Sequence, residues 1–225
     1  ITLGLWVGQG TTPNKFTTNN KAPGSLEAHN EQLKQDRPIN PFALMACPWC
    51  NTSIYPEKHD DNSSVYGVEA TETSFKFFCP DENCAFHRII PVNVIDEHFY
   101  EHPYQTNNNT YAGPPTFIVG TIDKLARTAW DARSRSIFGF RNKGKNVMPP
   151  SLVIQDELHL ISGPLGTIAG IYEAAFDVMM TAENRPKIIA ATATIRRADD
   201  QVKSLYGREV QIFPPSGLHA SDSYY

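Results

Sequence analysis

The sequence lacks a long apolar run and a strong excess of either charge. No stretch reaches the roughly 18 consecutive apolar residues that a membrane-spanning helix needs, and residues 1–8 lack the basic flank of a signal peptide. These absences favour a cytoplasmic protein with no membrane partner. The formal net charge is −4, so there is no global basic field, and any contact with nucleic acid must come from a local surface.

Also absent is the phosphate-binding loop of nucleotide hydrolases, Gly-x-x-x-x-Gly-Lys-Ser/Thr. Residues 8–12, Gly-Gln-Gly-Thr-Thr, are glycine-rich but contain no lysine. The chain begins with Ile1 rather than methionine, and residues 1–7 have the pattern of a strand with no preceding cap or turn. We therefore expect a piece of a longer protein, which by itself does not hydrolyse ATP.

Cysteine is scarce, and its four residues fall into two close pairs. Cys47 and Cys50 form a Cys-x-x-Cys pair, and Cys79 and Cys84 form a second pair with a longer spacing. Two short pairs on turns can supply the four thiolates that tetrahedral Zn²⁺ prefers. The spacing predicts a structural, zinc-ribbon-like module with four cysteine ligands and no open ligand position for catalysis.

Other uses of these cysteines remain open. Disulfides are disfavoured in a cytosolic chain, and a redox Cys-x-x-Cys is disfavoured because no βαβ pattern follows it. His87 could replace one thiolate, although its position favours a surface residue. The four residues between Cys79 and Cys84 also exceed the two of the tightest zinc-binding pairs.

Short apolar strands and helical periodicity follow residue 115. Strands are predicted at residues 116–120, 151–154, 187–191 and 210–213, and a short helix at residues 122–130. Continuous apolar strands joined by a crossover helix require a parallel sheet covered on both faces, which predicts an α/β fold. The crossover helix is predicted after a Gly-Pro pair, with apolar residues at helical spacing at Leu165, Ile168, Ala169, Tyr172, Ala175, Phe176 and Met179.

An acidic pair, Asp156 and Glu157, follows the strand at residues 151–154. Ligands of open parallel sheets bind beyond the carboxyl ends of the strands. One of two adjacent carboxylates can hold a water-bridged Mg²⁺, while the other orients and deprotonates an attacking water. By itself the pair is a weak sign, because most Asp-Glu dipeptides are solvated surface groups.

The neighbouring motifs allow a more specific interpretation of the acidic pair. Asp156-Glu157-Leu158-His159 resembles the Asp-Glu-x-His form of motif II of superfamily 2 helicases, and residues 191–194, Ala-Thr-Ala-Thr, resemble their motif III. Residues 116–125 resemble the segment that contacts the nucleic-acid backbone ahead of motif II. More narrowly, residues 150–170 and 213–222 resemble the helicase component of the DISARM phage-defence system, the DrmA type.

The resemblance implies a RecA-like parallel sheet, as part of a motor domain, in an ATP-dependent helicase or translocase. It implies action on DNA in bacterial anti-phage defence, with other subunits of a defence complex as partners. Asp156 is then expected to hold Mg²⁺, Glu157 to be the catalytic base, and His159 to couple the nucleotide state to motif III, at Thr192, Ala193 and Thr194. A hydrogen-bonded core histidine and strand-end threonine caps are the plainer alternatives.

Three residues are candidates for nucleic-acid contact: Thr121, Lys124 and Arg196. Thr121 and Lys124 stand at the start of the predicted helix, where backbone N–H groups and partial positive charge favour a phosphate. Arg196 could contact nucleic acid or a second motor domain, or face solvent. A further group of basic and aromatic residues could form a surface that follows a phosphate backbone, but a solvated loop is the slightly better interpretation. The group consists of Arg133, Arg135, Phe138, Phe140, Arg141, Lys143 and Lys145.

The resemblance and the composition together divide the chain into four predicted parts. Residues 1–45 hold a strand and a polar surface excursion, in which residues 25–34 could form a short capped helix. Residues 46–95 form the zinc-binding insertion, and residues 96–206 hold the RecA-like ATPase part with motifs II and III. Residues 207–225 form a linker toward a second motor domain.

Two other functions fit the sequence less well. A zinc-containing nucleic-acid or protein interaction module with a non-hydrolysing RecA-like fold would have no need of both Asp156 and Glu157. A metallohydrolase that uses Asp156, Glu157 and His159 as ligands ranks last, because neighbouring positions at one strand end converge poorly on a single ion.

Overall fold

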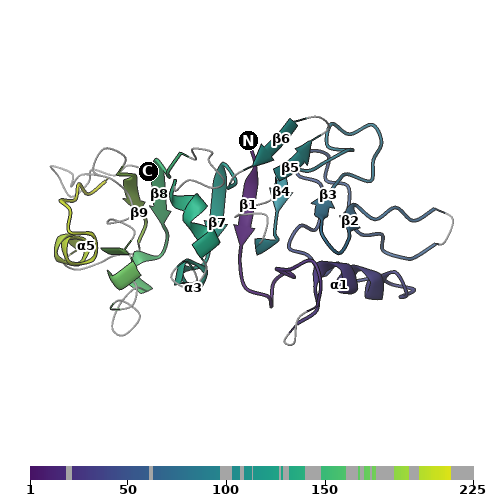
Figure 1. Cartoon of the computed structure of the whole chain (residues 1–225), viewed down its shortest axis with the longest axis horizontal. Helices are drawn as coiled ribbons and strands as arrows, with labels where there is room; N and C mark the ends of the chain where they lie inside the picture. The colour runs from purple at the N-terminus through teal and green to yellow at the C-terminus, as the bar shows by residue number, and fades with distance from the viewer. Residues whose placement is uncertain are drawn as a thin grey trace, which may run out of the picture. The chain divides into compact units, whose positions relative to one another are not determined.

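The structure, a computed structural model, describes most of the chain and divides it into two compact units, Ile1–Pro149 and Pro150–Tyr225. Each unit contains parallel strands and short helices (Figure 1). The predicted α/β class with parallel strands is confirmed, whereas the RecA-like topology stays a prediction. The described residues are 1–18, 22–60, 63–96, 103–106, 109–112, 114–126, 128, 132–139, 148–160, 167, 170–172, 174–175, 185–192 and 198–213.

A parallel sheet of three strands forms the centre of the first unit. Strand β1 (Leu3–Trp6) lies between β4 (Val92–Asn93) and β7 (Phe117–Gly120), and both neighbours run parallel to it (Figure 1). Leu3 is opposite Phe117, and Trp6 is opposite Gly120. A Cβ on Gly120 would approach the Trp6 carbonyl oxygen to 3.2 Å, so the small residue lets the two strand ends meet.

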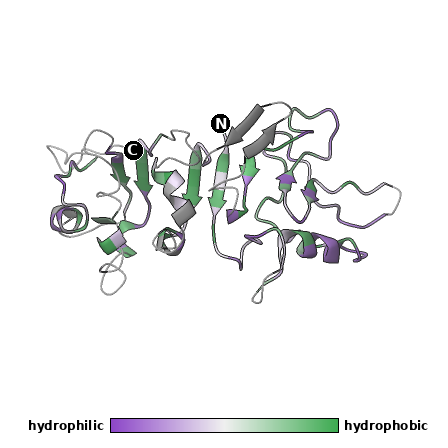
Figure 2. Cartoon of the chain, in the orientation of Figure 1, coloured by the Kyte–Doolittle hydropathy of each residue, from purple (hydrophilic) through white to green (hydrophobic). Residues whose placement is uncertain are grey.

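Two antiparallel hairpins and one helix complete the described elements before β7. Strands β2 (Val68–Ala70) and β3 (Phe75–Phe77) pair with each other, and so do β5 (Pro103–Thr106) and β6 (Asn109–Ala112). The β5–β6 hairpin lies in a segment for which the sequence predicted no strand. Helix α1 (Ser25–Gln32) confirms the short helix predicted within residues 25–34, although its N-cap is Gly24 and no side chain caps it; the helix is mostly hydrophilic (Figure 2).

One continuous hydrophobic cluster joins the cysteine segment to the parallel sheet. Its fully buried centre contains Phe42, Phe77 and Ile90, each 0% exposed, and Leu3 and Leu5 of β1 pack against it. An isolated antiparallel bridge between Phe77 and Ile90 connects β3 to the segment that enters β4. The complete list of buried members is Phe16, Phe42, Cys47, Ile54, Tyr55, Val68, Phe75, Phe77, Cys79, Cys84, Ile90, Val92, Val94 and Ile95.

Replacing Phe42 by alanine is expected to lower the free energy of unfolding by about 3–5 kcal/mol, because a buried ring leaves a cavity. Phe42 packs on Phe75 and Phe77, with ring centroids 4.8 and 5.8 Å apart. Urea unfolding of the two proteins measures the change. The control Ile39→Ala removes a side chain that is 75% exposed and should change stability by less than about 0.5 kcal/mol. Equal effects of the two variants would contradict the assigned core.

A cluster of two histidines and two tyrosines holds α1 against the cysteine segment. The His29 ring lies edge-on to the rings of Tyr55 and Tyr66, and its Nδ1 is 2.6 Å from the Tyr55 hydroxyl. His59 Nδ1 lies 2.8 Å from the Tyr66 hydroxyl. Burial lowers the pKa of His29 and raises the pKa of Tyr55, so both side chains are neutral in the folded protein at pH 7.

The lowered pKa of His29 predicts a loss of stability in acid. Below the ordinary histidine pKa of about 6.5, the unfolded chain binds a proton that the folded chain does not bind, so the free energy of unfolding falls as pH decreases. Urea unfolding between pH 7 and pH 5 should show a weaker fall in His29→Gln than in the wild type. Tyr55→Phe keeps the buried histidine and should retain the wild-type dependence. An identical profile for His29→Gln would exclude His29 as the source.

The second unit contains a parallel pair of strands and a helix. Strands β8 (Leu152–Gln155) and β9 (Lys187–Ala190) are paired in register, and α5 (Ala198–Tyr206) follows them. Both strands confirm their predicted positions and are mainly hydrophobic (Figure 2). The strand predicted at residues 210–213 is wrong: these residues form no strand, and Ile212 and Phe213 are 60% and 80% exposed.

Between β7 and residue 149, the described residues of the first unit include the helical segments α3 (Ile122–Ala126) and η2, a 3-10 helix (Ala132–Phe138). Helix α3 covers the first part of the helix predicted for residues 122–130, of which residues 127, 129 and 130 lie outside the described residues. Phe138 is buried, whereas Phe140, Arg141, Lys143 and Lys145 lie outside the described residues. No helix in the described part of the chain is both long and apolar enough to cross a bilayer.

Candidate metal centre and strand-end carboxylates

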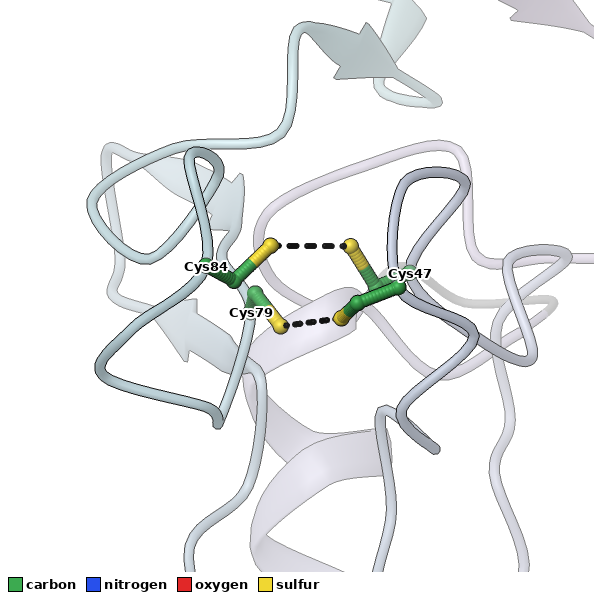
Figure 3. A group of neighbouring side chains, drawn as sticks. Cys47, Cys79 and Cys84 are labelled. Carbon is green, nitrogen blue, oxygen red and sulfur yellow. Dashed lines mark hydrogen bonds between the residues drawn. The ribbon is translucent and has the colours of Figure 1, made fainter.

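Four cysteine sulfurs converge between two loops of the first unit (Figure 3). Cys47 and Cys50 belong to the first knuckle, residues 46–53, and Cys79 and Cys84 to the second knuckle, residues 79–87. All four Sγ atoms lie within 4.8 Å of one another. Two of the separations join the knuckles: 3.7 Å between the sulfurs of Cys47 and Cys84, and 3.4 Å between those of Cys50 and Cys79. The predicted gathering of the four thiols is confirmed.

These separations fit a metal ion better than disulfide bonds. Tetrahedral zinc with Zn–S bonds of about 2.3 Å places its sulfurs about 3.8 Å apart, whereas a disulfide bond is about 2.05 Å long. All four cysteines are free thiols. The His87 ring is exposed and is not one of the clustered ligands, so the donor set is four sulfurs, which suits Zn²⁺.

Backbone hydrogen bonds shape each knuckle. In the first, Cys47 N–H donates to the Thr52 carbonyl oxygen at 2.8 Å, and Asn51 N–H donates to the Cys47 carbonyl oxygen at 2.9 Å. Asn51 has a φ of 62°, in the left-handed region that asparagine tolerates. In the second, Phe86 N–H donates to the Cys84 sulfur at 3.4 Å. Both knuckles therefore hold their sulfurs in place through the backbone, which lowers the ordering cost of binding a metal.

The thiols differ in their tendency to ionise. Thr52, whose hydroxyl lies 3.1 Å from the Cys50 sulfur, lowers the pKa of Cys50 to about 6. Burial raises the pKa of Cys79 to about 12. Cys50 therefore ionises more readily than Cys79. A bound divalent cation must displace the Cys79 proton, so the affinity for metal falls in acid.

The cluster predicts one zinc ion per chain. Cys84→Ser is expected to lose the metal and to weaken the first unit, because the sulfur is buried and supplies one of four ligands. Inductively coupled plasma mass spectrometry of the purified protein measures the zinc content. His87→Ala removes an exposed imidazole three residues away and should keep one equivalent. A wild-type protein that is folded without any metal would refute the site.

In the second unit, β8 and β9 end side by side. Gln155 is opposite Ala190, and Ala191 N–H donates to the Gln155 carbonyl oxygen at 2.8 Å. Leu158 N–H then donates to the Ala191 carbonyl oxygen at 3.0 Å, and its side chain is 1% exposed. These contacts anchor the short 3-10 helix η3 (Leu158–Leu160), so the residues of predicted motif II lie beside the start of predicted motif III.

The acidic pair occupies the turn between β8 and η3. Glu157 has a φ of 50°, which is unusual for a residue other than glycine, and its N–H donates to Asp156 Oδ1 at 2.9 Å. Glu157 Oε2 lies 3.2 Å from His159 Nδ1. Both carboxylates are exposed, whereas His159 is half-buried. Strained backbone of this kind occurs at sites where a side chain must be aimed in a particular direction.

The remaining predicted residues have different surroundings. Thr192 is exposed just after β9, next to Ala191, and Thr121 is exposed just after β7. Lys124 is buried, and its Nζ donates to both carboxylate oxygens of Asp96 at 3.1 Å. A phosphate could reach this Nζ only if the ion pair opened. Ala193, Thr194 and Arg196 lie outside the described residues, so their predicted roles stay predictions.

Three residues that contact the cysteine cluster or the Lys124–Asp96 ion pair were not predicted from the sequence. Thr52 lies beside the Cys50 sulfur, Asp96 accepts hydrogen bonds from the Lys124 amine, and Asn14 donates to Asp96. Asp96 directly follows the mainly apolar residues 89–95, much as Asp156 closely follows the strand predicted at residues 151–154. That parallel was the available signal for Asp96. The partners of Thr52 and Asn14 depend on loop geometry, for which the sequence offers no pattern.

No family model matches the chain. Comparison with curated proteins finds that the chain, over its whole length, is 33% identical to DISARM protein DrmA of Bacillus paralicheniformis, in an alignment of 264 residues. The chain spans 22% of the length of that relative. The aligned region includes the cysteine knuckles, the acidic pair and the segment after β9, because it covers the entire chain. The chain is therefore related over its whole length to part of DISARM protein DrmA, which confirms the DrmA-type resemblance.

Proposed function

We propose that the chain is part of an ATP-dependent superfamily 2 helicase or translocase that acts on DNA in bacterial anti-phage defence. One observation carries the proposal: Asp156 and Glu157 stand at the carboxyl end of β8, directly beside the end of the parallel strand β9. The carboxyl edge of parallel strands is where α/β proteins bind nucleotides. The relation to DISARM protein DrmA supports the role in defence and an association with other subunits of such a system.

In this proposal the acidic turn divides two tasks between adjacent carboxylates. Asp156 would hold the hydrated Mg²⁺ of the nucleotide, and that cation would neutralise charge on the phosphates. Glu157 orients the attacking water and accepts its proton. Both groups are exposed, so substrate can reach them. The phosphate-binding loop comes from another part of the complete protein.

His159 is the proposed link between the nucleotide and the next strand. Its Nδ1 is 3.2 Å from Glu157, and the neighbouring Leu158 is hydrogen-bonded to Ala191. A change at Glu157 upon hydrolysis would therefore reach the segment that begins motif III, where Thr192, Ala193 and Thr194 are the proposed recipients. The nucleic acid is proposed to contact the segments around Thr121, Lys124 and Arg196.

Zinc has a structural role in this proposal. The four sulfurs leave no ligand position for a water, and three of the four cysteines are buried. Within the described residues, the four cysteines are the only group of three or more His, Cys, Asp or Glu side chains that could hold a metal ion. Asp156, Glu157 and His159 form no such group, which disfavours the metallohydrolase.

The test of the motor is ATP hydrolysis by the complete protein, with DNA, RNA and Mg²⁺ supplied. Glu157→Gln should lower DNA-stimulated turnover by about 10²–10⁴-fold, because it removes the general base, and should retain ATP binding measured with a fluorescent analogue. Glu209→Gln, which changes an exposed glutamate of the same unit, should behave as the wild type.

Unimpaired turnover in Glu157→Gln would contradict the role of Glu157 as the general base. A wild-type protein without any stimulated turnover would favour the alternative, a zinc-containing interaction module with a non-hydrolysing fold.

A further inference from the structure

A buried ion pair lies at the carboxyl edge of the three-stranded sheet. Lys124 Nζ donates to Asp96 Oδ1 and Oδ2, both at 3.1 Å. The two side chains are only 7% and 8% exposed. An ion pair this far from water is held in a single geometry, because each charge would be left unsolvated if its partner moved away.

Asn14 extends the pair to the segment that follows β1. Its Nδ2 donates to the Val7 carbonyl oxygen at 2.8 Å and to Asp96 Oδ1 at 3.4 Å. The Asp96 N–H donates in return to the Asn14 carbonyl oxygen at 2.9 Å. Asp96 therefore joins the chain beyond β1, the chain beyond β4 and helix α3, which follows β7.

The position of Asp96 is itself fixed by the hydrophobic cluster. Val94 and Ile95, which precede it, are 0% exposed and belong to the cluster that contains Phe77 and Cys79. On the other side, Thr121 N–H donates to the Trp6 carbonyl oxygen at 3.3 Å. The start of α3 is thus held at two points: by the end of β1 through Thr121, and by Asp96 through Lys124.

We propose that Asp96 is a positioning residue for nucleic-acid contact: by holding the buried Lys124 amine, it fixes α3 so that the exposed Thr121 faces the backbone of the bound strand. This inference rests on the proposed function. It assigns Lys124 to anchoring α3, where the sequence had predicted a direct phosphate contact. Asp96 does not touch the nucleic acid, and its effect passes through Lys124.

The experiment uses the complete protein with three variants: Asp96→Asn, Lys124→Met and the double variant, which leaves no unpaired buried charge. Each is expected to raise the half-saturating concentration of a single-stranded DNA oligonucleotide in the ATPase assay by about threefold to thirtyfold, the range for residues that act through another residue. Turnover at saturating DNA should stay within about twofold of the wild type. The double variant should be no weaker than either single variant, because all three break the same contact.

Two further measurements separate positioning from direct contact and from a general loss of structure. The slope of log affinity against log salt should be unchanged in Lys124→Met, whereas loss of a direct phosphate contact lowers it by about 0.7 for single strands. Hydrogen–deuterium exchange of peptides that contain α3 should become faster in the variants, with β1 peptides unchanged. The controls Lys76→Met and Glu69→Gln break an ion pair of the same unit whose side chains are 38% and 55% exposed, and should change none of these values.

Unchanged exchange at α3, or a reduced salt slope in Lys124→Met with wild-type affinity in Asp96→Asn, would overturn the positioning role. The two proposals can also fail separately. If the wild-type protein shows no DNA-stimulated turnover but the variants still exchange faster at α3, the proposed motor function is overturned, whereas the role of Asp96 in holding α3 is supported.

Discussion

The convergence of four cysteine sulfurs is the constraint around which the first unit is built. Cys47, Cys79 and Cys84 are buried within the same hydrophobic cluster as Phe77 and Ile90. The bridge between Phe77 and Ile90 joins the hairpin beside the second knuckle to the segment that enters β4. The geometry of the thiols and the position of an edge strand of the parallel sheet therefore depend on one set of contacts, which reaches Asp96 through Val94 and Ile95.

Patterns that depend on neighbouring residues were predictable from the sequence. The two cysteine pairs indicated a four-sulfur site because short spacings on turns leave few other uses for thiols, and the sulfurs do converge. The strands predicted at residues 116–120, 151–154 and 187–191 correspond to β7, β8 and β9, because buried parallel strands are continuous apolar runs. The pairing of β8 with β9 then follows, and it brings the acidic turn beside Ala191.

Features that depend on distant partners were not predictable. Lys124 looked like a free cation at a helix start, but its partner Asp96 is 28 positions away and is brought to it by the pairing of β4, β1 and β7. Residues 210–213 have a strand-like composition, but they pair with no strand in the described part of the chain, so composition alone gave a wrong prediction. The β5–β6 hairpin had a signal in the sequence that was overlooked, because a run of asparagines such as residues 107–109 is typical of turns.

The hydrophobic cluster shared by the cysteine segment and the sheet also limits how such a chain can change over evolutionary time. A shortened version that replaced residues 46–91 by a brief linker would lose Ile54, Phe75 and Phe77, and it would leave Phe42 and Val92 facing water. The cysteine segment could therefore not be inserted or deleted as a unit while the rest of the sheet stayed unchanged. The knuckles and the edge of the sheet can diverge only together, through coordinated replacements on both sides of their common interior.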